Sequence, residues 1–534
     1  MANKPSTRLL RPYRGRTAAL CAITVLTSLL QVCTALVTRD VVDAAMAGEQ
    51  SLFTWGALLI AILAALVLLN ALHGWLGGST ADRCVAQLRH SLLQCMAYSE
   101  DEKMYAYHSG ALLSRGMEDV RTVCDGMVNV LPSMVGNLVR LAASFAAAVL
   151  LLPSLTGVIA LAAVVIAASA ALVRPVIKRH HAKVRQADEQ VMTTMQESLQ
   201  NLELIKSIRA EEQILSRFDQ RLGGSLLAYK RRRRWMVGRN TFISALSQLG
   251  TGVLLIWGAS RVAAGTMSYG SLAAMLQLIS LLRNPVLGLS GLWTRMAAVE
   301  VAQERLELLL QDVPPVQPLE ISQVSAVVFE DVTFAYPDEE TPVLAHFSAR
   351  FDLDRWVCLT GMSGRGKTTV FKLMLGLYQP QQGRVYLQTD CGQIPCGSNT
   401  RHLFAYVPQD YALLSGSVLD NLILAAPEAT AQQRAEALRL AQADFVWELS
   451  GGEQTLLREN NEGLSKGQLQ RLAVARAILM DRPVFLLDEC TSALDSATER
   501  ALLENLLRLN KQGVLVTHRP EALEQLQGLT VKPM

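Results

Sequence analysis

The sequence has little charge for its length and lacks any CxxC cysteine pair. Only 18% of its 534 residues are Asp, Glu, Lys or Arg, whereas 50% are hydrophobic. This composition excludes a disordered chain and is unusual for a soluble enzyme. The formal net charge of +3 gives no reason to expect a nucleic-acid partner. The nine cysteines are scattered, so we expect reduced thiols rather than a disulfide scaffold or a structural zinc site. The composition indicates a membrane protein.

The apolar residues gather in the first half of the chain, in six runs. A helix needs roughly 20 apolar residues to cross a bilayer. The runs that meet or approach this length are 17–38, 51–80, 126–152, 153–173, 240–260 and 270–298. Turn-forming residues at 153–157 and 265–270 predict tight hairpins between antiparallel helices. The first run extends past the length of a signal peptide and lacks a clear cleavage site, so we interpret it as a span.

Basic residues predict the orientation of these spans. Five of them precede the first run, namely Lys4, Arg8, Arg11, Arg14 and Arg16. Because basic residues collect on the cytoplasmic side, the N-terminus is predicted to be cytoplasmic, and six spans return the second half of the chain to the same side. The basic run 230–234 follows the fourth span, and this position next to the membrane explains it better than a nucleic-acid patch does. We therefore predict a multi-pass protein of the cell membrane.

The connections on the predicted inner side are long and helical. The stretch 178–239 keeps apolar residues at helical spacing, and no proline occurs between Val176 and Pro285. At 1.5 Å per residue, the helices of spans four and five would project roughly 35–40 Å beyond the membrane. A turn between them is expected within 203–224, and 82–125 is expected to form a similar hairpin.

A proline-rich segment at 312–318 ends the helical half, because proline cannot continue a helix. Beyond it the chain alternates between strand and helix patterns, which indicates an α/β domain. We predict a transmembrane domain at 1–312, a linker at 313–320 and an α/β domain at 321–534.

The α/β half contains a phosphate-binding loop. Residues 361–368 read GMSGRGKT, a full match to the G-x-x-x-x-G-K-[ST] pattern, between an apolar strand at 356–360 and a helix that follows. Backbone N–H groups of such a loop surround phosphates. Lys367 would reach the β- and γ-phosphates, and the Thr368 hydroxyl would bind Mg²⁺. The predicted ATP-binding residues of this segment are Gly361, Ser363, Gly364, Gly366, Lys367, Thr368 and Thr369.

A second apolar strand, 484–489, ends in two carboxylates. Asp488 is placed to hold Mg²⁺, and Glu489 to polarise an attacking water as a general base. Acidic residues at the end of a strand are often only solvated caps. The assignment therefore depends on the phosphate-binding loop upstream.

Together with further segments, these residues resemble the ATP-binding cassette (ABC) family. The segments are FAY ending at Tyr336, YVPQ ending at Gln409, LSKGQ at 464–468, SALD ending at Asp495 and VTH ending at His518. They are similar to the family's adenine-stacking aromatic, Q-loop, signature, D-loop and switch histidine, in family order. The six spans, the long inner hairpins and the N-terminal basic segment, similar to an elbow helix, resemble exporter-type half-transporters. The resemblance covers the whole chain.

The resemblance implies a fold class and a set of residue roles. The fold is a six-helix transmembrane domain with long cytoplasmic extensions, followed by an α/β P-loop NTPase domain. The implied catalytic residues are Glu489, His518 and Gln409, and the implied Mg²⁺ ligands are Thr368, Gln409 and Asp488. Tyr336 would stack on adenine, Asp495 is implied as the D-loop residue, and the signature residues implied to contact ATP across a dimer are Leu464, Ser465, Lys466, Gly467 and Gln468.

One position departs from the family pattern. The signature usually has glycine where this chain has Lys466. The resemblance requires the Ser465 hydroxyl and the Gly467 N–H to meet the γ-phosphate held by the other subunit, and both residues are present. We expect hydrolysis to survive, with the rate and the nucleotide affinity open to change.

The resemblance implies an ATPase that exports a substrate through a dimer of half-transporters. A homodimer is the simplest assembly, and a heterodimer with a related chain stays open. Peptides, lipids and amphipathic small molecules are all candidate substrates; no cysteine-peptidase domain is apparent, so coupled leader cleavage is not expected. The alternatives are an importer that uses the exporter fold and an ATP-gated regulatory protein that does not pump.

Two arginines within the spans suggest what is carried. Arg140 lies near the middle of the third span and Arg283 inside the sixth, where Gln277 also lies. An arginine facing lipid at mid-depth costs at least ~2.5–3.5 kcal/mol, so both are expected to face the bundle interior or a watery cavity. No acidic residue lies in the central stretches of the spans. The hypothesis is a cavity that favours an anionic substrate, and the alternative is that each arginine bonds backbone carbonyls or extends toward an interface.

Overall fold

The structure is a computed structural model of the 534-residue chain. It describes residues 10–99, 112, 115–151, 176, 179–180, 182–310, 318–321, 323–337, 339, 341–362, 364–410, 413–457, 463–517 and 529–533. The chain divides into two compact units, Met1–Leu93 with Leu112–Gln311 and Gln94–Ala111 with Asp312–Met534. We call the first the membrane unit and the second the cassette unit.

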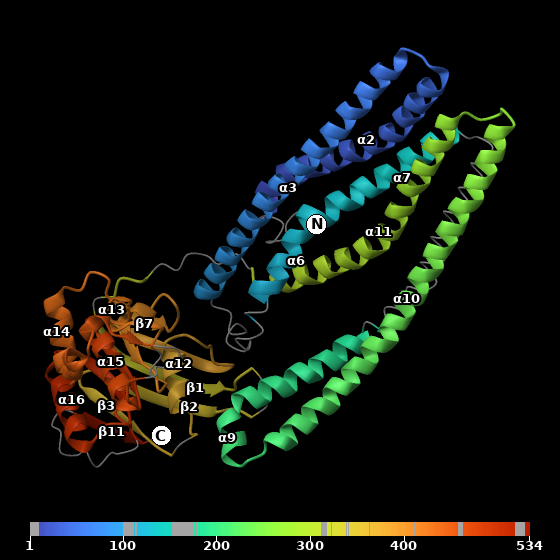
Figure 1. Ribbon diagram of the computed structural model, residues 1–534. Helices are drawn as coiled ribbons and strands as arrows, with labels where there is room; N and C mark the ends of the chain where they lie inside the picture. The colour runs from blue at the N-terminus through green and yellow to red at the C-terminus, as the bar shows by residue number, and fades with distance from the viewer. Residues whose placement is uncertain are drawn as a thin grey trace. The chain divides into compact units, whose positions relative to one another are not determined.

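The membrane unit consists of long helices (Figure 1). After a short turn at Arg11–Tyr13, its described helices are α2 (Arg14–Ala47), α3 (Ser51–Tyr98), α6 (Val120–Asp125), α7 (Leu131–Leu151), α9 (Leu202–Ser207), α10 (Glu211–Ala263) and α11 (Tyr269–Glu307), and residues 182–200 are also helical. Single turns of wider helix at Arg115–Asp119 and Gly126–Val130 flank α6. These make 115–151 one continuous helical rod.

The two described hairpins at the predicted outer side are joined by Asp43. Gly48 adopts a left-handed conformation (φ +68°) and ends α2, and Gly265 (φ +71°) turns the chain after α10. The Asp43 carboxylate accepts a hydrogen bond from the Gly270 N–H (2.8 Å) and another from the Ser268 hydroxyl (2.8 Å). The start of α11 is therefore bound to the end of α2.

Helices α2, α7 and α11 share one apolar interior. Their buried residues form a cluster made of Val32, Ala35, Ala147, Ala148 and Leu278. Gly136 allows α7 to approach α2, since a Cβ at this position would lie 2.3 Å from the Thr24 methyl group. The buried Ser28 hydroxyl donates to the Gly136 carbonyl (3.0 Å) and satisfies both groups.

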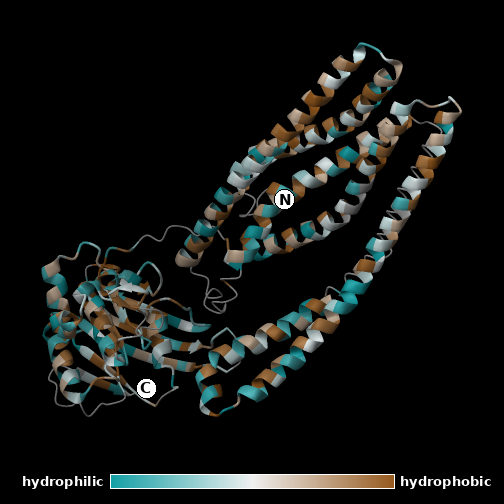
Figure 2. Ribbon diagram, viewed as in Figure 1, coloured by the Kyte–Doolittle hydropathy of each residue, from teal (hydrophilic) through white to brown (hydrophobic). Residues whose placement is uncertain are grey.

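Three helical segments among the described residues are long and apolar enough to cross a membrane, namely Arg11–Ala47, Ser51–Tyr98 and Arg115–Leu151. They contain the first three predicted spans. The fourth, 153–173, lies outside the described residues. The fifth and sixth lie within α10 and α11, and there only the stretch Tyr269–Leu282 stands out as a shorter apolar helix. Figure 2 shows the lower part of α10 as hydrophilic.

The long helices extend well past a bilayer. α10 has 53 residues, which corresponds to about 80 Å at 1.5 Å per residue, against a hydrocarbon core of about 30 Å. The chain reverses between α9 and α10, at residues 208–210, within the predicted interval. The helical residues 182–200 then pack against α10, because Asp188 accepts hydrogen bonds from the hydroxyls of Ser225 (2.7 Å) and Tyr229 (2.6 Å).

The cassette unit contains two main sheets. The antiparallel sheet has the order β2-β1-β4-β5 and the parallel sheet the order β11-β3-β10-β9-β6. Their strands are β1 (Val324–Phe334), β2 (Leu344–Asp352), β3 (Trp356–Thr360), β4 (Gln382–Thr389), β5 (Gly392–Pro395), β6 (Phe404–Val407), β9 (Val484–Asp488), β10 (Gln512–Val516) and β11 (Leu529–Pro533). A small pair is formed by β7 (Gly416–Ser417) and β8 (Leu456–Leu457).

The helices of the cassette unit cover the parallel sheet (Figure 1). They are α12 (Lys367–Met374), α13 (Val418–Ile423), α14 (Ala431–Leu440), α15 (Lys466–Leu479) and α16 (Ser496–Arg508). The five residues of β9 are all buried, as expected for a central parallel strand covered on both faces. Because the strands are parallel, their carboxyl ends meet at one edge of the sheet, where α/β proteins bind ligands.

Candidate functional site

Three predicted segments come together at the carboxyl edge of the parallel sheet. The phosphate-binding loop follows β3, Gln409 follows β6, Asp488 ends β9 and Glu489 follows it directly. The first and last of these strands, β3 and β9, are separated by more than 120 residues of sequence. The edge of the sheet thus brings together residues that the sequence predicted from separate motifs.

The phosphate-binding loop is tightly curved. Gly364 (φ +82°) and Gly366 (φ +86°) adopt left-handed conformations that favour glycine. Gly366 caps α12, so the N-terminus of this helix points toward the loop. The buried Lys367 ammonium donates to the carbonyls of Gly361 (2.8 Å) and Met362 (3.1 Å), which closes the loop over it. Ser363 lies outside the described residues.

Tyr336 lies beside α12, the helix that follows the phosphate-binding loop. Its hydroxyl is 3.0 Å from the hydroxyl oxygen of the buried Thr369. Its ring makes edge contacts with Phe334 (5.1 Å between centroids) and Tyr378 (5.4 Å), and the Lys372 ammonium lies 5.2 Å from its centroid. The aromatic residue predicted to stack on adenine is thus fixed next to the phosphate-binding helix.

Asp488 is fully buried at the end of β9, and no described residue makes a hydrogen bond of standard geometry to either of its carboxylate oxygens. Burial raises the pKa of Asp488 above its ordinary value, and the Thr368 hydroxyl and the Lys367 ammonium oppose the rise from nearby. A buried carboxylate without a partner is costly, so the surroundings favour a cation here. Mg²⁺ prefers hard oxygen ligands, and the carboxylate of Asp488 beside the Thr368 hydroxyl fits this preference.

Glu489 is held by its neighbours in an unusual conformation. Its backbone is left-handed (φ +50°), which is uncommon for a residue other than glycine. The Glu489 N–H donates to the Val516 carbonyl (3.1 Å), and the Gln409 amide donates to the Glu489 carboxylate (2.9 Å). The carboxylate is only partly buried, so a water can approach it.

Gln470 contacts Glu489 and the predicted D-loop, although the sequence predicted no role for it. Its side chain is fully buried, and its amide donates to the Glu489 carbonyl (3.2 Å) and to the Ser492 hydroxyl (3.0 Å). Its side-chain oxygen accepts from the Ala493 N–H (3.1 Å). Gln470 therefore connects α15 to Glu489 and to the predicted D-loop. The only sequence signal was its place in residues 469–471, LQR, which directly follow the signature at 464–468.

The predicted signature forms the start of α15. Ser465 caps the helix by accepting from the Gln468 N–H (3.2 Å), and the Gln468 side chain accepts from the Ser465 N–H (2.8 Å). Leu464 packs against the core of the cassette unit. Gly467 is buried so close to the predicted D-loop that a Cβ would lie 2.9 Å from the Ala493 carbonyl oxygen. Lys466 is the first residue of the helix and its side chain is exposed.

Asp495 has a structural role within the chain. It caps α16 by accepting from the N–H groups of Ala497 (3.1 Å) and Thr498 (3.0 Å) and from the Thr498 hydroxyl (2.7 Å). These hydrogen bonds, the Thr498 N–H first among them, lower the pKa of Asp495. His518 lies outside the described residues.

Comparisons with known proteins decide the family. Residues 17–286, just over half of the chain, match the family model described as ABC transporter transmembrane region, and residues 344–492 match the model described as ABC transporter. The chain belongs to the ABC transporter family. The family and the fold class predicted from the sequence are confirmed, whereas the roles of single residues stay predictions.

The chain is similar to several curated ABC proteins. It is 31% identical over 373 residues to a Lactococcus lactis "Lactococcin transport/processing ATP-binding protein LcnC-like", which covers 67% of this chain and 50% of the relative. It is 29% identical over 358 residues to "Alpha-hemolysin translocation ATP-binding protein HlyB" of Escherichia coli O157:H7, which covers 65% and 50%. The chain thus spans about half the length of these two relatives.

Two further likenesses cover more of both chains. The "ATP-dependent lipid A-core flippase" of Chromobacterium violaceum is 29% identical over 471 residues, which are 86% of this chain and 79% of the flippase. A solved bacterial Atm1-family ABC exporter with ATP bound has a TM-score of 0.82 at 20% identity and covers 97% of this chain and 93% of its own. At this identity the second likeness shows the fold.

The predicted substrate-cavity residues of this ABC transporter lie on neighbouring helices. Arg140 is on α7 and Gln277 on α11, both partly buried; Arg283 is on α11, but its side chain lies outside the described residues. The Arg140 Nε and the Gln277 side-chain oxygen are enclosed without a hydrogen-bond partner among the described residues. The same holds for Gln31 on α2 and the fully buried Ser144 on α7, which the sequence did not single out because neither is charged.

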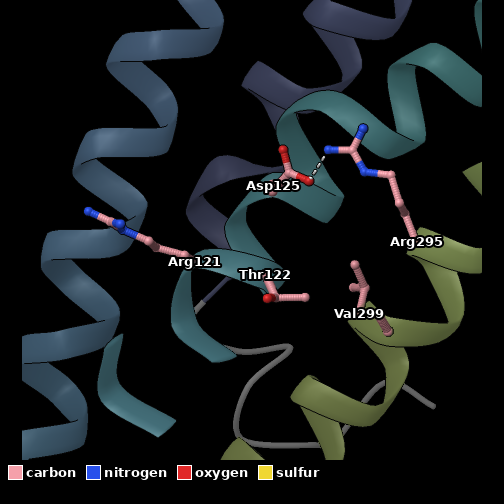
Figure 3. A pocket seen from close by; sticks show the side chains of 6 residues that line it. Arg121, Thr122, Asp125, Arg295 and Val299 are labelled. Atoms are coloured by element: carbon pink, nitrogen blue, oxygen red, sulfur yellow. Dashed lines mark hydrogen bonds and ion pairs between the residues drawn. The ribbon is translucent and has the colours of Figure 1, made fainter. Parts of the chain in front are cut away.

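A separate pocket of about 280 Å³ lies between α6 and α11 (Figure 3). It is lined by Arg121, Thr122, Asp125, Arg295, Ala298 and Val299. The Arg295 guanidinium pairs with the Asp125 carboxylate at 2.7 Å, whereas Arg121 points away from this pair. The pocket contains none of the predicted site residues.

Proposed function

We propose that this chain is an ATP-driven exporter that works as a dimer of half-transporters. The single observation that carries the proposal is the carboxyl edge of the parallel sheet. There the Lys367 loop, the buried Asp488 carboxylate and the Gln409–Glu489 pair lie together. The names of the relatives, which describe transport, translocation and flipping, support the coupling to transport, and the exporter with a similar fold supports the direction.

In this proposal, different residues at the sheet edge bind the phosphates, accept a proton and stack on adenine. The Lys367 ammonium exchanges its two carbonyl partners for the β- and γ-phosphates, while the backbone N–H groups of the loop and of α12 bind the remaining phosphate oxygens. Glu489 accepts the proton of the attacking water, and the Gln409 amide holds that carboxylate in place until the nucleotide and Mg²⁺ bind. Tyr336 stacks on adenine. His518 is proposed as the switch histidine by resemblance alone.

Asp488, Thr368 and Gln409 are proposed to hold Mg²⁺ together with the nucleotide. The ion supplies positive charge against the negative charge of the phosphates. The orphaned carboxylate oxygens of Asp488 support this assignment, since they otherwise lie buried without a partner. The Gln409 side chain would then exchange its Glu489 contact for the ion and the water.

The signature residues act on the nucleotide of the other subunit in this proposal. The capped start of α15 presents the Ser465 hydroxyl and the Gly467 N–H, and the close packing of Gly467 on Ala493 couples that helix to Asp495 and its loop. Both halves of a complete site occur in this chain, so two copies suffice. We therefore propose a homodimer, and a related half-transporter would satisfy the same geometry.

The membrane unit is proposed to carry an anionic substrate with the cassettes in the cytoplasm. The basic residues before α2 support this orientation. Support for the substrate comes from Arg140, whose enclosed Nε lacks a partner, and from the enclosed oxygens of Gln31 and Gln277. An unpaired buried polar group costs about 1–3 kcal/mol, and a polar substrate would remove this cost. Arg283 joins this set by its place in α11.

The test is transport by the purified full chain in lipid vesicles. With the cassettes outside, an exporter accumulates labelled substrate inside the vesicles only when ATP and Mg²⁺ are present. A panel of acidic peptides, anionic lipids and amphipathic drugs identifies the substrate by stimulation of the ATPase rate. Movement in the opposite direction would make the chain an importer, and ATP hydrolysis without any movement would make it a regulatory protein.

A further inference from the structure

We propose that Cys84 and Cys124 form a reversible disulfide that joins α3 to α6 when the protein meets a peroxide. The two sulfur atoms lie 2.8 Å apart, and Cys124 donates its S–H to Cys84. Each residue is only 1% exposed, and both are free thiols in the structure. They are 40 positions apart in the sequence, outside any recognised cysteine motif.

The sulfur–sulfur distance selects a disulfide over a metal site. A disulfide bond is about 2.05 Å long, so the sulfurs need to approach by only about 0.8 Å from their 2.8 Å separation. Two thiolates on a tetrahedral zinc ion, each at about 2.3 Å from the metal, would lie roughly 3.8 Å apart. The thiols would therefore have to separate to bind the ion.

The packing on both sides of the pair keeps the sulfurs together. Toward one end of the contact, a Cβ on Gly77 of α3 would lie 3.3 Å from a methyl group of Val128. Toward the other, Arg89 of α3 donates to the Gly116 carbonyl (3.2 Å), and Leu92 packs over Gly116. These contacts pair α3 with residues 116–128 in antiparallel register, so the bond can form without a change of register.

The chemistry needs one equivalent of peroxide. The Cys84 sulfur, which accepts the S–H of Cys124, attacks one peroxide oxygen; the O–O bond breaks, and a sulfenic acid and one water are left. The Cys124 sulfur then attacks the Cys84 sulfur, the S–O bond breaks, and the hydroxyl leaves as a second water with the Cys124 proton. Two thiols are oxidised by two electrons and the peroxide is reduced by two electrons. A small thiol reverses the bond by exchange.

The position of Cys84 and Cys124 indicates that their disulfide forms only under oxidising conditions. Cys84 follows the second predicted span by four residues, and Cys124 precedes the third by two. In the orientation proposed above, this end of the spans faces the cytoplasm, where thiols are kept reduced and disulfides are usually transient. Once formed, the bond constrains the unfolded chain and holds α3 on α6, so the oxidised protein is the more stable form.

The experiment uses the full chain in lipid nanodiscs. Protein reduced with dithiothreitol is treated with a series of hydrogen peroxide concentrations, alkylated, digested and analysed by mass spectrometry. We expect a peptide pair joined through Cys84 and Cys124, its loss on renewed reduction, and a higher thermal unfolding midpoint of the oxidised protein. Cys84→Ser and Cys124→Ser should each lose the joined pair and the shift in midpoint, whereas Cys33→Ser, which removes an exposed thiol of α2, should keep both.

The exposed Cys391 calibrates the oxidation within the same sample. If Cys391 is oxidised while Cys84 and Cys124 stay fully alkylated, the proposal is wrong. Stable sulfinic acids on either residue, or a bond from either one to another cysteine, would overturn it too. The wild-type peptides decide the matter even if a serine variant fails to fold. ATPase activity does not enter the result, so a failure here is distinct from a failure of the proposed transport function.

Discussion

The cassette unit and the membrane unit differ in where the polar groups that carry the proposed functions lie. In the cassette unit, Lys367 and Gln470 are buried with specific partners, and the unpartnered Asp488 lies where a cation is expected. In the described part of the membrane unit, polar atoms of Gln31, Arg140, Ser144 and Gln277 are enclosed without partners and are distributed over three helices. The proposed nucleotide site is thus concentrated at one sheet edge, whereas the proposed substrate contacts are spread over helices far apart in sequence.

The largest effect expected at the sheet edge is that of Glu489→Gln. The amide cannot accept the proton of the attacking water, so ATP turnover should fall by about 10²-fold or more. ATP binding should survive, because Lys367 and the loop are unchanged. The rate of phosphate release and the binding of a fluorescent ATP analogue measure the two effects separately.

Glu489→Asp is the matched control for this change. It keeps a carboxylate but shortens its reach to water, so it should recover part of the rate. A Glu489→Gln protein that hydrolyses ATP near the original rate would remove the assignment of the base. The proposed catalytic residues would then no longer be gathered at one edge of the parallel sheet, and the contrast with the membrane unit would fail.

The second prediction concerns the burial of Asp488 without a partner. In the nucleotide-free protein its pKa is raised, so the stability associated with the neutral acid is present below the ordinary pKa and is lost as pH rises through the raised one. Asp488→Asn is neutral throughout. At pH 7 it should raise the unfolding midpoint of the cassette by about 2–4 °C, the shift for 1 kcal/mol in a domain of this size.

Two further measurements define the Asp488 prediction. The difference in midpoint should shrink as pH approaches 4, and the variant should lose the Mg²⁺ dependence of nucleotide hydrolysis together with most of its rate. Asp495→Asn serves for comparison, because Asp495 is exposed and accepts hydrogen bonds at a helix cap. It should lower the midpoint rather than raise it. An Asp488→Asn protein that is less stable than wild type at pH 7 would contradict the burial argument.

A contrast between local patterns and contacts far apart in the chain explains which features the sequence could predict. The phosphate-binding loop and the apolar strand that leads to Asp488 depend on local patterns, and the structure has both, with the strand one residue shorter than expected. Gln470 was passed over because its importance comes from contacts with Glu489 and Ala493, which no spacing reveals. Gln31 and Ser144 were missed because a neutral residue in a span gives no signal until the packing of helices encloses it.

The third prediction tests the membrane unit through Arg140→Gln. Loss of the guanidinium charge should raise the concentration of an anionic substrate needed for half-maximal ATPase stimulation by about tenfold, equivalent to about 1.4 kcal/mol. Each protein is measured relative to its own basal rate. Ser144→Ala is the matched comparison: it removes a neutral polar group one turn away on the same helix and should keep the preference for anions over neutral analogues. Equal stimulation of Arg140→Gln and wild type by the same anion would exclude Arg140 from recognition.

The smallest effect is expected at Lys466, where the cassette unit departs from its family. The side chain is exposed at the first position of α15, and the cap between Ser465 and Gln468 does not use it. Lys466→Gly should therefore change the ATPase rate by only about two- to threefold, since no transition-state contact is lost. Lys466→Gln removes the charge without adding the backbone freedom of glycine, so it separates the effects of these two changes. If both variants raise the ATP concentration for half-maximal rate by tenfold or more, the ammonium contacts the γ-phosphate across the dimer. The Lys466 side chain, exposed in one chain, would then contact nucleotide only when the second copy is present. In the same way, the enclosed polar groups of the membrane unit would gain a partner only when a substrate binds.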